Sequence, residues 1–160
     1  MRSTTSCSTL FALTLLLLSL TLPALAAPAR CSTASGAGDW AYSYSGTIFL
    51  PTGPVSVVNV GRFTALANGT FSGTQTRSIG GDVAVEAVSG TFHEKSDCTV
   101  TYTANVYQGE ELVRTATLAT VTSNNGRTAR GIFTSLSLAD GTSLPNVLTI
   151  ESERIFPDQN

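Results

Sequence analysis

The chain has 160 residues, of which 12% are charged, and its formal net charge at pH 7 is −2. A chain of this length is expected to form one domain around a single apolar core. Because its few basic residues form no run or patch, the composition argues against nucleic acid or an anionic lipid surface as a partner.

The first 26 residues have the pattern of a secretory signal peptide. Arg2 precedes an apolar run from Leu10 to Leu22, and Ala24 and Ala26 place small residues where signal peptidase cleaves. The run is shorter than the roughly 20 apolar residues that a membrane-spanning helix needs. We therefore predict a signal peptide over residues 1–26 and a secreted, extracellular protein, or a periplasmic one in a Gram-negative host, with no membrane partner after cleavage. An uncleaved N-terminal anchor is the alternative.

Cys31 and Cys98 are the two cysteines that remain after cleavage. An even number of cysteines in an exported protein favours a disulfide, which would tether the N-terminal segment, residues 27–39, to the rest of the domain. A metal site formed by the two thiols is the alternative, but no histidine or further cysteine lies at ligand spacing. We therefore predict a Cys31–Cys98 disulfide, no metal and no cofactor.

The remainder of the chain, residues 40–160, shows the period-two alternation of β-strands. Apolar side chains occupy every second position from Trp40 to Leu50 and from Cys98 to Val106. Pairs such as Asn68-Gly69 supply the positive φ angles that tight hairpin turns require. The predicted strands cover residues 40–50, 55–67, 70–78, 83–93, 98–107, 112–122, 129–138 and 147–156.

Short connections make consecutive strands antiparallel neighbours. About eight such strands can close into an up-and-down barrel, which leaves no exposed sheet edge. We therefore predict an all-β fold, a single antiparallel up-and-down barrel. A two-sheet β-sandwich is the alternative, but it would need longer crossover connections, for which only residues 140–146 offer room.

Several short motifs resemble a group of small secreted proteins of environmental microbes. The motifs are Gly61-Arg62-Phe63, Asn68-Gly69-Thr70-Phe71-Ser72-Gly73-Thr74, Gly80-Gly81, Gly90-Thr91-Phe92, Asp97-Cys98-Thr99, Ala129-Arg130-Gly131-Ile132-Phe133 and Glu153-Arg154-Ile155. That uncharacterised group looks like a calycin or allene-oxide-cyclase-type barrel. The resemblance implies an architecture and no catalytic residues. This chain departs from the pattern at Val100, where the group usually has glycine.

Aromatic side chains at alternate positions mark a candidate binding site. Trp40, Tyr42 and Tyr44 share one face of the first predicted strand, and Tyr102 lies on the apolar face of a central strand. Aromatic residues in such positions either fill a core or line a small-molecule pocket. Core packing is the simpler interpretation, and a pocket for a small apolar ligand is the functional one.

Glu86 lies within the apolar stretch of residues 83–88. Inside a barrel its carboxylate would need a partner, and it could then anchor a ligand or promote a cyclisation. The candidate partners are the arginines that fall within strands, Arg62, Arg77, Arg114 and Arg130. The interpretation that we favour instead places Glu86 on the solvent face, opposite in phase to Val83 and Val85.

Two further residues allow a functional and a simpler interpretation. His93, the single histidine, stands beside Glu94 and Lys95, which is typical of an exposed turn, and without a second histidine a zinc site or a Ser-His-Asp triad has little support. Asn68-Gly69-Thr70 is a glycosylation sequon at a predicted turn, and it applies only in a eukaryotic host.

Three classes of function remain open. The sequence favours a secreted binding module that holds a small apolar ligand inside the barrel. The second class is a surface-interaction, inhibitor or structural protein that binds an extracellular macromolecule. The third, ranked last, is a cofactor-free isomerase or cyclase that acts through the shape of its pocket. A cavity in the barrel favours the first and third classes, and a solid core favours the second.

Overall fold

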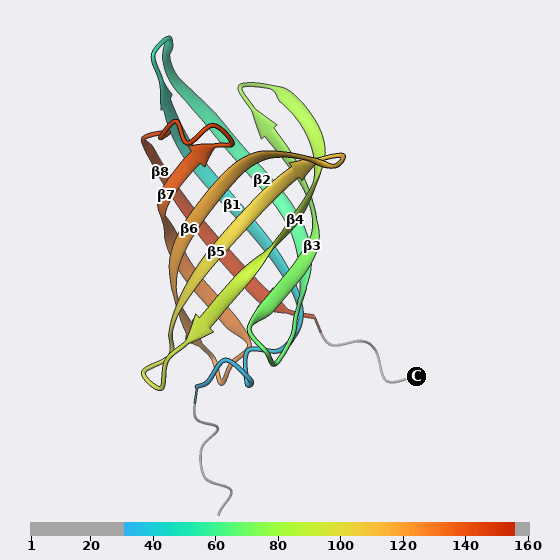
Figure 1. Cartoon of the computed structure of the whole chain (residues 1–160). Helices are drawn as coiled ribbons and strands as arrows, with labels where there is room; N and C mark the ends of the chain where they lie inside the picture. The colour runs from blue at the N-terminus through green and yellow to red at the C-terminus, as the bar shows by residue number, and fades with distance from the viewer. Residues whose placement is uncertain (1–30, 156–160) are drawn as a thin grey trace, which may run out of the picture.

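The computed structural model describes residues 31–155, and the predicted signal peptide lies outside these residues. Antiparallel strands form a closed barrel in which each strand pairs with its neighbours in the sequence and the last pairs with the first (Figure 1). The strands are β1 (Gly38–Leu50), β2 (Gly53–Ala65), β3 (Thr70–Ile79), β4 (Asp82–Glu94), β5 (Thr99–Gln108), β6 (Glu111–Ser123), β7 (Thr128–Leu138) and β8 (Asn146–Arg154). The predicted all-β up-and-down barrel is therefore confirmed, and the sandwich alternative is wrong.

The tight turns form where the sequence predicted them. Between β3 and β4, Gly80 and Gly81 both adopt positive φ angles, of 58° and 93°. Between β2 and β3, Gly69 has a φ of 84°, and the Asn68 side chain accepts a hydrogen bond from the backbone N–H of Thr70 at 3.0 Å. These residues tolerate the left-handed backbone region, so they set where each strand ends.

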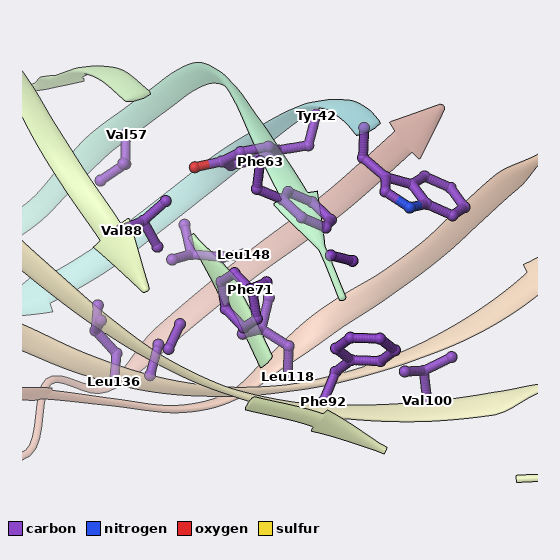
Figure 2. Packing of buried hydrophobic residues seen from close by; sticks show 14 of the residues in the cluster. Tyr42, Val57, Phe63, Phe71, Val88, Phe92, Val100, Leu118, Leu136 and Leu148 are labelled. Carbon is purple, nitrogen blue, oxygen red and sulfur yellow. The ribbon is translucent and has the colours of Figure 1, made fainter. Parts of the chain in front are cut away.

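One face of every strand packs into the barrel interior. Phe63 and Phe71 lie at its centre with ring centroids 5.4 Å apart, and Tyr102 packs against Phe71 and Phe92 at 5.9 and 5.8 Å. Figure 2 shows these phenylalanines among the buried aliphatic side chains that the other strands contribute. Aromatic pairs at these separations stabilise a core beyond the effect of buried area alone.

Two inward-facing glycines make room for this packing. A Cβ atom on Gly61 would lie 2.7 Å from the ring of Tyr42, and one on Gly90 would lie 3.0 Å from the ring of Phe71 and 2.0 Å from the carbonyl oxygen of Thr103. Both distances to the rings are shorter than van der Waals contact allows. Two glycines of the sequence motifs are therefore positions where a ring or a neighbouring backbone occupies the space of a side chain.

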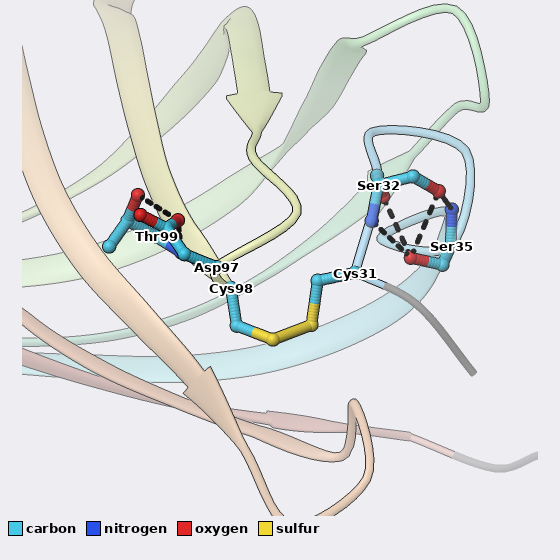
Figure 3. Close-up of a disulfide and its surroundings, with 6 residues drawn as sticks. All are labelled: Cys31, Ser32, Ser35, Asp97, Cys98 and Thr99. Carbon is cyan, nitrogen blue, oxygen red and sulfur yellow. Dashed lines mark hydrogen bonds between the residues drawn. A yellow bond between two sulfur atoms is a disulfide. The ribbon is translucent and has the colours of Figure 1, made fainter. Parts of the chain in front are cut away.

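The N-terminal segment crosses the lower end of the barrel in the view of Figure 1. The Cys31–Cys98 disulfide, across a sequence separation of 67 residues, attaches it to the start of β5, so the predicted bond is confirmed (Figure 3). Trp40 at the start of β1 donates a hydrogen bond from Nε1 to the carbonyl oxygen of Gly36 at 3.1 Å. The guanidinium of Arg154 stacks on the Trp40 ring, 5.0 Å from its centroid. A structural disulfide of this kind indicates a non-reducing environment.

The outer face of the barrel carries a group of exposed valines among serines and threonines. Val58 and Val60 on β2 and Val83 and Val85 on β4 are more than half exposed, on either side of β3. Residues 31–155 include no helix that is long and apolar enough to cross a membrane.

Removing the disulfide should destabilise the fold without changing its topology. Replacing both cysteines, Cys31→Ser with Cys98→Ser, frees the closed loop in the unfolded chain, and the free energy of unfolding should fall by about 4 kcal/mol. Denaturant titration of the mature protein measures this change. A thiol titration of the unmutated protein is the control, and recovery of two free thiols would show that the bond does not form.

Candidate ligand-binding site

A cavity lies in the barrel interior, lined by side chains from all eight strands. The centre of a water molecule can reach about 70 Å³ of it. Its wall is mostly apolar, and Phe63, Phe71, Leu118, Phe133 and Ile150 provide much of it. Polar side chains in its wall distinguish the cavity from a packing void, because small-molecule sites combine apolar walls with a few placed polar groups.

Glu86 on β4 is the centre of a buried polar cluster, which we define as Gln75, Arg77, Glu86 and Arg114. The Oε1 atom of Glu86 accepts a hydrogen bond from Nε of Arg77 at 3.0 Å. Its Oε2 atom accepts one from Nε2 of Gln75 at 2.9 Å and one from Nη2 of Arg114. Arg77 also bonds Asp82 Oδ2 at 2.5 Å, which places the cluster toward the β3–β4 turn. Both carboxylate oxygens therefore have charged donors.

Glu86 does not face solvent, so the orientation that we favoured from the sequence is wrong. The residue is 1% exposed, whereas Val83 and Val85 are 64% and 70% exposed. Val88 and Phe92 share the phase of Glu86 and are the larger apolar side chains at the centre of the barrel, so their burial sets the orientation of β4. Burial of the carboxylate is tolerated because two arginines and an amide meet it.

The charge of Glu86 is stable inside the barrel. Burial raises the pKa of its carboxyl group, but the hydrogen bonds from Arg114, Gln75 and Arg77 outweigh burial, and the pKa lies below its usual value. The group is therefore ionised at neutral pH, and both of its oxygens accept hydrogen bonds. It serves to hold Gln75 and Arg114, both of which line the cavity.

Two tyrosines extend the polar cluster toward β1. The hydroxyl of Tyr42 donates to Oε1 of Gln75 at 2.8 Å, and Nε2 of Gln75 donates to the Tyr44 hydroxyl at 3.5 Å. Burial raises the pKa of Tyr42 well above its ordinary value, with the charges of Tyr44 and Glu86 acting in the same direction. Burial also raises the pKa of Tyr44, although Arg114 opposes this effect. Both phenols are therefore protonated at neutral pH.

The cavity includes some of the residues that the sequence singled out and omits others. Tyr42, Tyr44 and Tyr102 line it. Trp40 lies at the lower end and is not part of its wall, and Glu86 contributes only through Gln75 and Arg114. The role of all five in ligand binding stays a prediction.

The structure also selects among the arginines considered as partners of Glu86. Arg77 and Arg114 reach the carboxylate, whereas Arg62 and Arg130 are exposed on the outside. Sequence reasoning missed Gln75 as a cavity residue. The alternation of β3 could have identified it, because Gln75 and Arg77 lie on the same face of the strand as the buried Phe71.

Two buried polar side chains have no hydrogen-bond partner among the described residues. The hydroxyl of Thr120 on β6 is one, and Thr120 lines the cavity. The other is Asn59 on β2, whose amide oxygen and nitrogen are both unpaired, and which lies opposite Tyr44 and Arg77 in the strand register. Each unpaired buried polar group lowers the stability of the fold by about 1–3 kcal/mol. Such a group therefore needs an explanation, and a functional role is one.

The remaining candidates lie outside the cavity. His93 is exposed, with its Nδ1 atom 3.3 Å from the Thr33 hydroxyl. Asn68 is exposed at the β2–β3 turn, and its side-chain oxygen accepts a hydrogen bond from the Thr70 hydroxyl at 2.8 Å. Across residues 31–155, no three His, Cys, Asp or Glu side chains gather as a metal centre would require.

Comparisons with known proteins bear on the fold. No protein-family model and no curated protein matches the chain. The barrel is similar to a solved structure from the de novo design of transmembrane β-barrels, with a TM-score of 0.55 and 11% identity over 72% of this chain and 95% of that one. It is also similar to EF1p2_mFAP2b bound to DFHBI, with a TM-score of 0.51 and 13% identity over 76% and 94% of the two chains.

At these identities the likeness shows the β-barrel fold alone. The relation to the small secreted proteins of environmental microbes, and to the calycin type of barrel, stays a prediction.

Replacing Glu86 should destabilise the protein strongly and in a pH-dependent way. Glu86→Gln leaves Arg77 and Arg114 without a buried counter-charge, so the free energy of unfolding at pH 7 should fall by about 3–5 kcal/mol. The pKa of Glu86 is lowered from an ordinary value of 4.5, so the stabilisation is complete above that pH and is lost as the pH falls further. Denaturant unfolding of both forms between pH 3 and 7 should therefore show the difference shrinking in acid.

The matched control for this experiment is Glu151→Gln. Glu151 forms an ion pair with Arg130 at 3.4 Å, and both side chains are exposed. Exposed pairs contribute about 0–1 kcal/mol, so this variant should unfold much like the unmutated protein. Equal effects of the two substitutions would contradict the assigned role of Glu86.

Proposed function

We propose that the protein is a binding module that holds a small, mostly apolar molecule inside its barrel. The observation that carries the proposal is the cavity whose apolar wall ends at Gln75 and Arg114, with the unpaired hydroxyl of Thr120 also in its lining. Apolar walls supply affinity, and a few fixed polar groups orient the ligand. The similar structure of EF1p2_mFAP2b bound to DFHBI supports the proposal, because a protein with a fold of this type binds a small molecule.

The size of the cavity limits what it holds without rearrangement. Its accessible volume of about 70 Å³ is roughly half of an engineered 150 Å³ cavity that admits benzene. A larger ligand enters when a wall side chain moves. Tyr44 and Phe133 suit this role because both are only partly buried, and they contact each other edge to face with ring centroids 5.0 Å apart.

A cofactor-free isomerase or cyclase receives less support from the site. Proton transfer requires a group that can gain or lose a proton near neutral pH. The pKa of Glu86 is lowered by its hydrogen bonds despite burial, and both of its oxygens are engaged. A surface-interaction function is supported less than binding because the barrel interior is not completely filled.

We also propose that the protein acts after export. The disulfide fits a non-reducing compartment, and the pattern of residues 1–26 is that of a cleaved leader. The intact mass of protein recovered from outside the producing cell should correspond to residues 27–160, less two hydrogens for the disulfide. A mass that retains the leader would favour the anchored alternative.

Filling the cavity should abolish binding. Ala116 is buried on β6 and lines the cavity, so Ala116→Leu adds volume where the ligand would lie. The control is Ala119→Leu on the outer face of the same strand. Titration with an environment-sensitive naphthalene dye, followed by fluorescence, should show saturable binding to the unmutated protein and to Ala119→Leu, and a loss of at least tenfold in affinity for Ala116→Leu.

Equal dye binding by both leucine variants would place the dye on the surface and refute the proposal. Circular dichroism checks that each variant is folded, because added volume in a packed core costs about 1–3 kcal/mol. Native mass spectrometry of protein purified from its source gives an independent test through any molecule that the barrel retains.

A further inference from the structure

The polar end of the cavity has more hydrogen-bond donors than acceptors. Arg114 carries five N–H donors, and its one bond within the described residues goes to Glu86. The Tyr44 hydroxyl accepts a bond from Gln75, while its own hydrogen has no acceptor among those residues. Gln75 Oε1 accepts from Tyr42, and both oxygens of Glu86 have donors. An acceptor without a partner among the described residues is the amide oxygen of Asn59, which lies opposite Tyr44 in the strand register.

The ion pairs of the cluster also point to Arg114 as the side chain that can take a further partner. Two arginines of the cluster, Arg77 and Arg114, are about one-tenth exposed, and they share one fully buried carboxylate, Glu86. Asp82, the other anion in contact, has a side chain that is 75% exposed, and its ion pair is with Arg77. Among the described residues, Arg114 therefore has one anionic partner, Glu86, which it shares with Arg77. Buried charges are costly unless they are paired.

We propose that the ligand is an apolar molecule that carries a carboxylate, and that Arg114 and the Tyr44 hydroxyl bind this carboxylate. The inference rests on the proposed binding function and names its ligand class. A carboxylate offers acceptors to both donors and places a second negative charge beside Arg114. The planar guanidinium of Arg114 matches the two oxygens of a carboxylate, which an amide or an alcohol does not reproduce.

Glu86 is the positioning residue for this site. Its carboxylate holds Arg114 and Gln75 at the cavity wall, and Gln75 in turn contacts Tyr44. Glu86 accepts one hydrogen bond from Nη2 of Arg114, and the other N–H groups of Arg114 have no acceptor among the described residues. The apolar part of the ligand then lies against Phe133 and the central rings below the cluster.

A pair of probes that differ only in charge tests the inference. Benzoate and benzamide have nearly the same shape, and titration calorimetry at pH 7 measures the affinity of each. The unmutated protein should bind benzoate at least tenfold more tightly than benzamide. In Arg114→Gln this ratio should fall to about one. In Arg130→Gln, which removes an exposed arginine from the outer face, the ratio should not change.

Two further variants keep the test decisive. Phe133→Ala enlarges the cavity, so it should bind both probes more tightly with the same preference for benzoate. If Arg114→Gln does not fold, Tyr44→Phe removes only the hydroxyl, and it should lower the ratio several-fold.

Equal affinity for the two probes, with the naphthalene dye still bound in the cavity, would overturn the carboxylate inference and leave the proposed function intact. A preference for benzoate that persists in Arg114→Gln would also overturn it. Absence of binding by the dye and by both probes, including in Phe133→Ala, would refute the binding function itself.

Discussion

The pairing of β1 with β8 is the contact on which the rest of the structure depends. It closes the sheet from Trp40 opposite Arg154 to Ile48 opposite Asn146, so every strand has a paired neighbour on both sides. Closure also divides every strand into an inner and an outer face. A polar residue on the inner face then bonds to other inner residues, as Glu86 does, or stays without a partner among the described residues, as Asn59 and Thr120 do. The cavity and its polar cluster both follow from this division.

Burying the charged groups of the polar cluster costs free energy that apolar side chains in the same place would not cost. Replacing a buried ionic group by apolar side chains of similar volume is often neutral or stabilising, so burial of Glu86 with Arg77 and Arg114 is weak evidence of a stabilising role. The cluster instead fixes the positions of polar atoms at one end of an otherwise apolar cavity. A ligand with acceptor atoms can bind the N–H groups of Arg114 that have no partner among the described residues, which is why the cluster carries the functional argument.

Most of the fold was predictable because its determinants are local. Alternation identified the inner face of β1, where Trp40 and Tyr42 are buried, and the turn residues located the strand ends to within two residues. The same reasoning failed at Glu86 because Val83 and Val85 are β-branched and apolar, like core residues, yet they face solvent. Alternation gives two faces but does not say which one is buried, and the long-range packing of Phe92 and Val88 decided it.

By itself, the sequence determined the number of strands, their order and the cysteine pairing. Each of these depends on turn chemistry, on period-two patterning or on the parity of two cysteines. Only the tertiary structure decided that Arg77 and Arg114, which lie on strands that are not neighbours, meet at one carboxylate. The inner faces of non-adjacent strands come together only when the sheet closes, and the resulting separations across the barrel interior are not encoded in any local pattern.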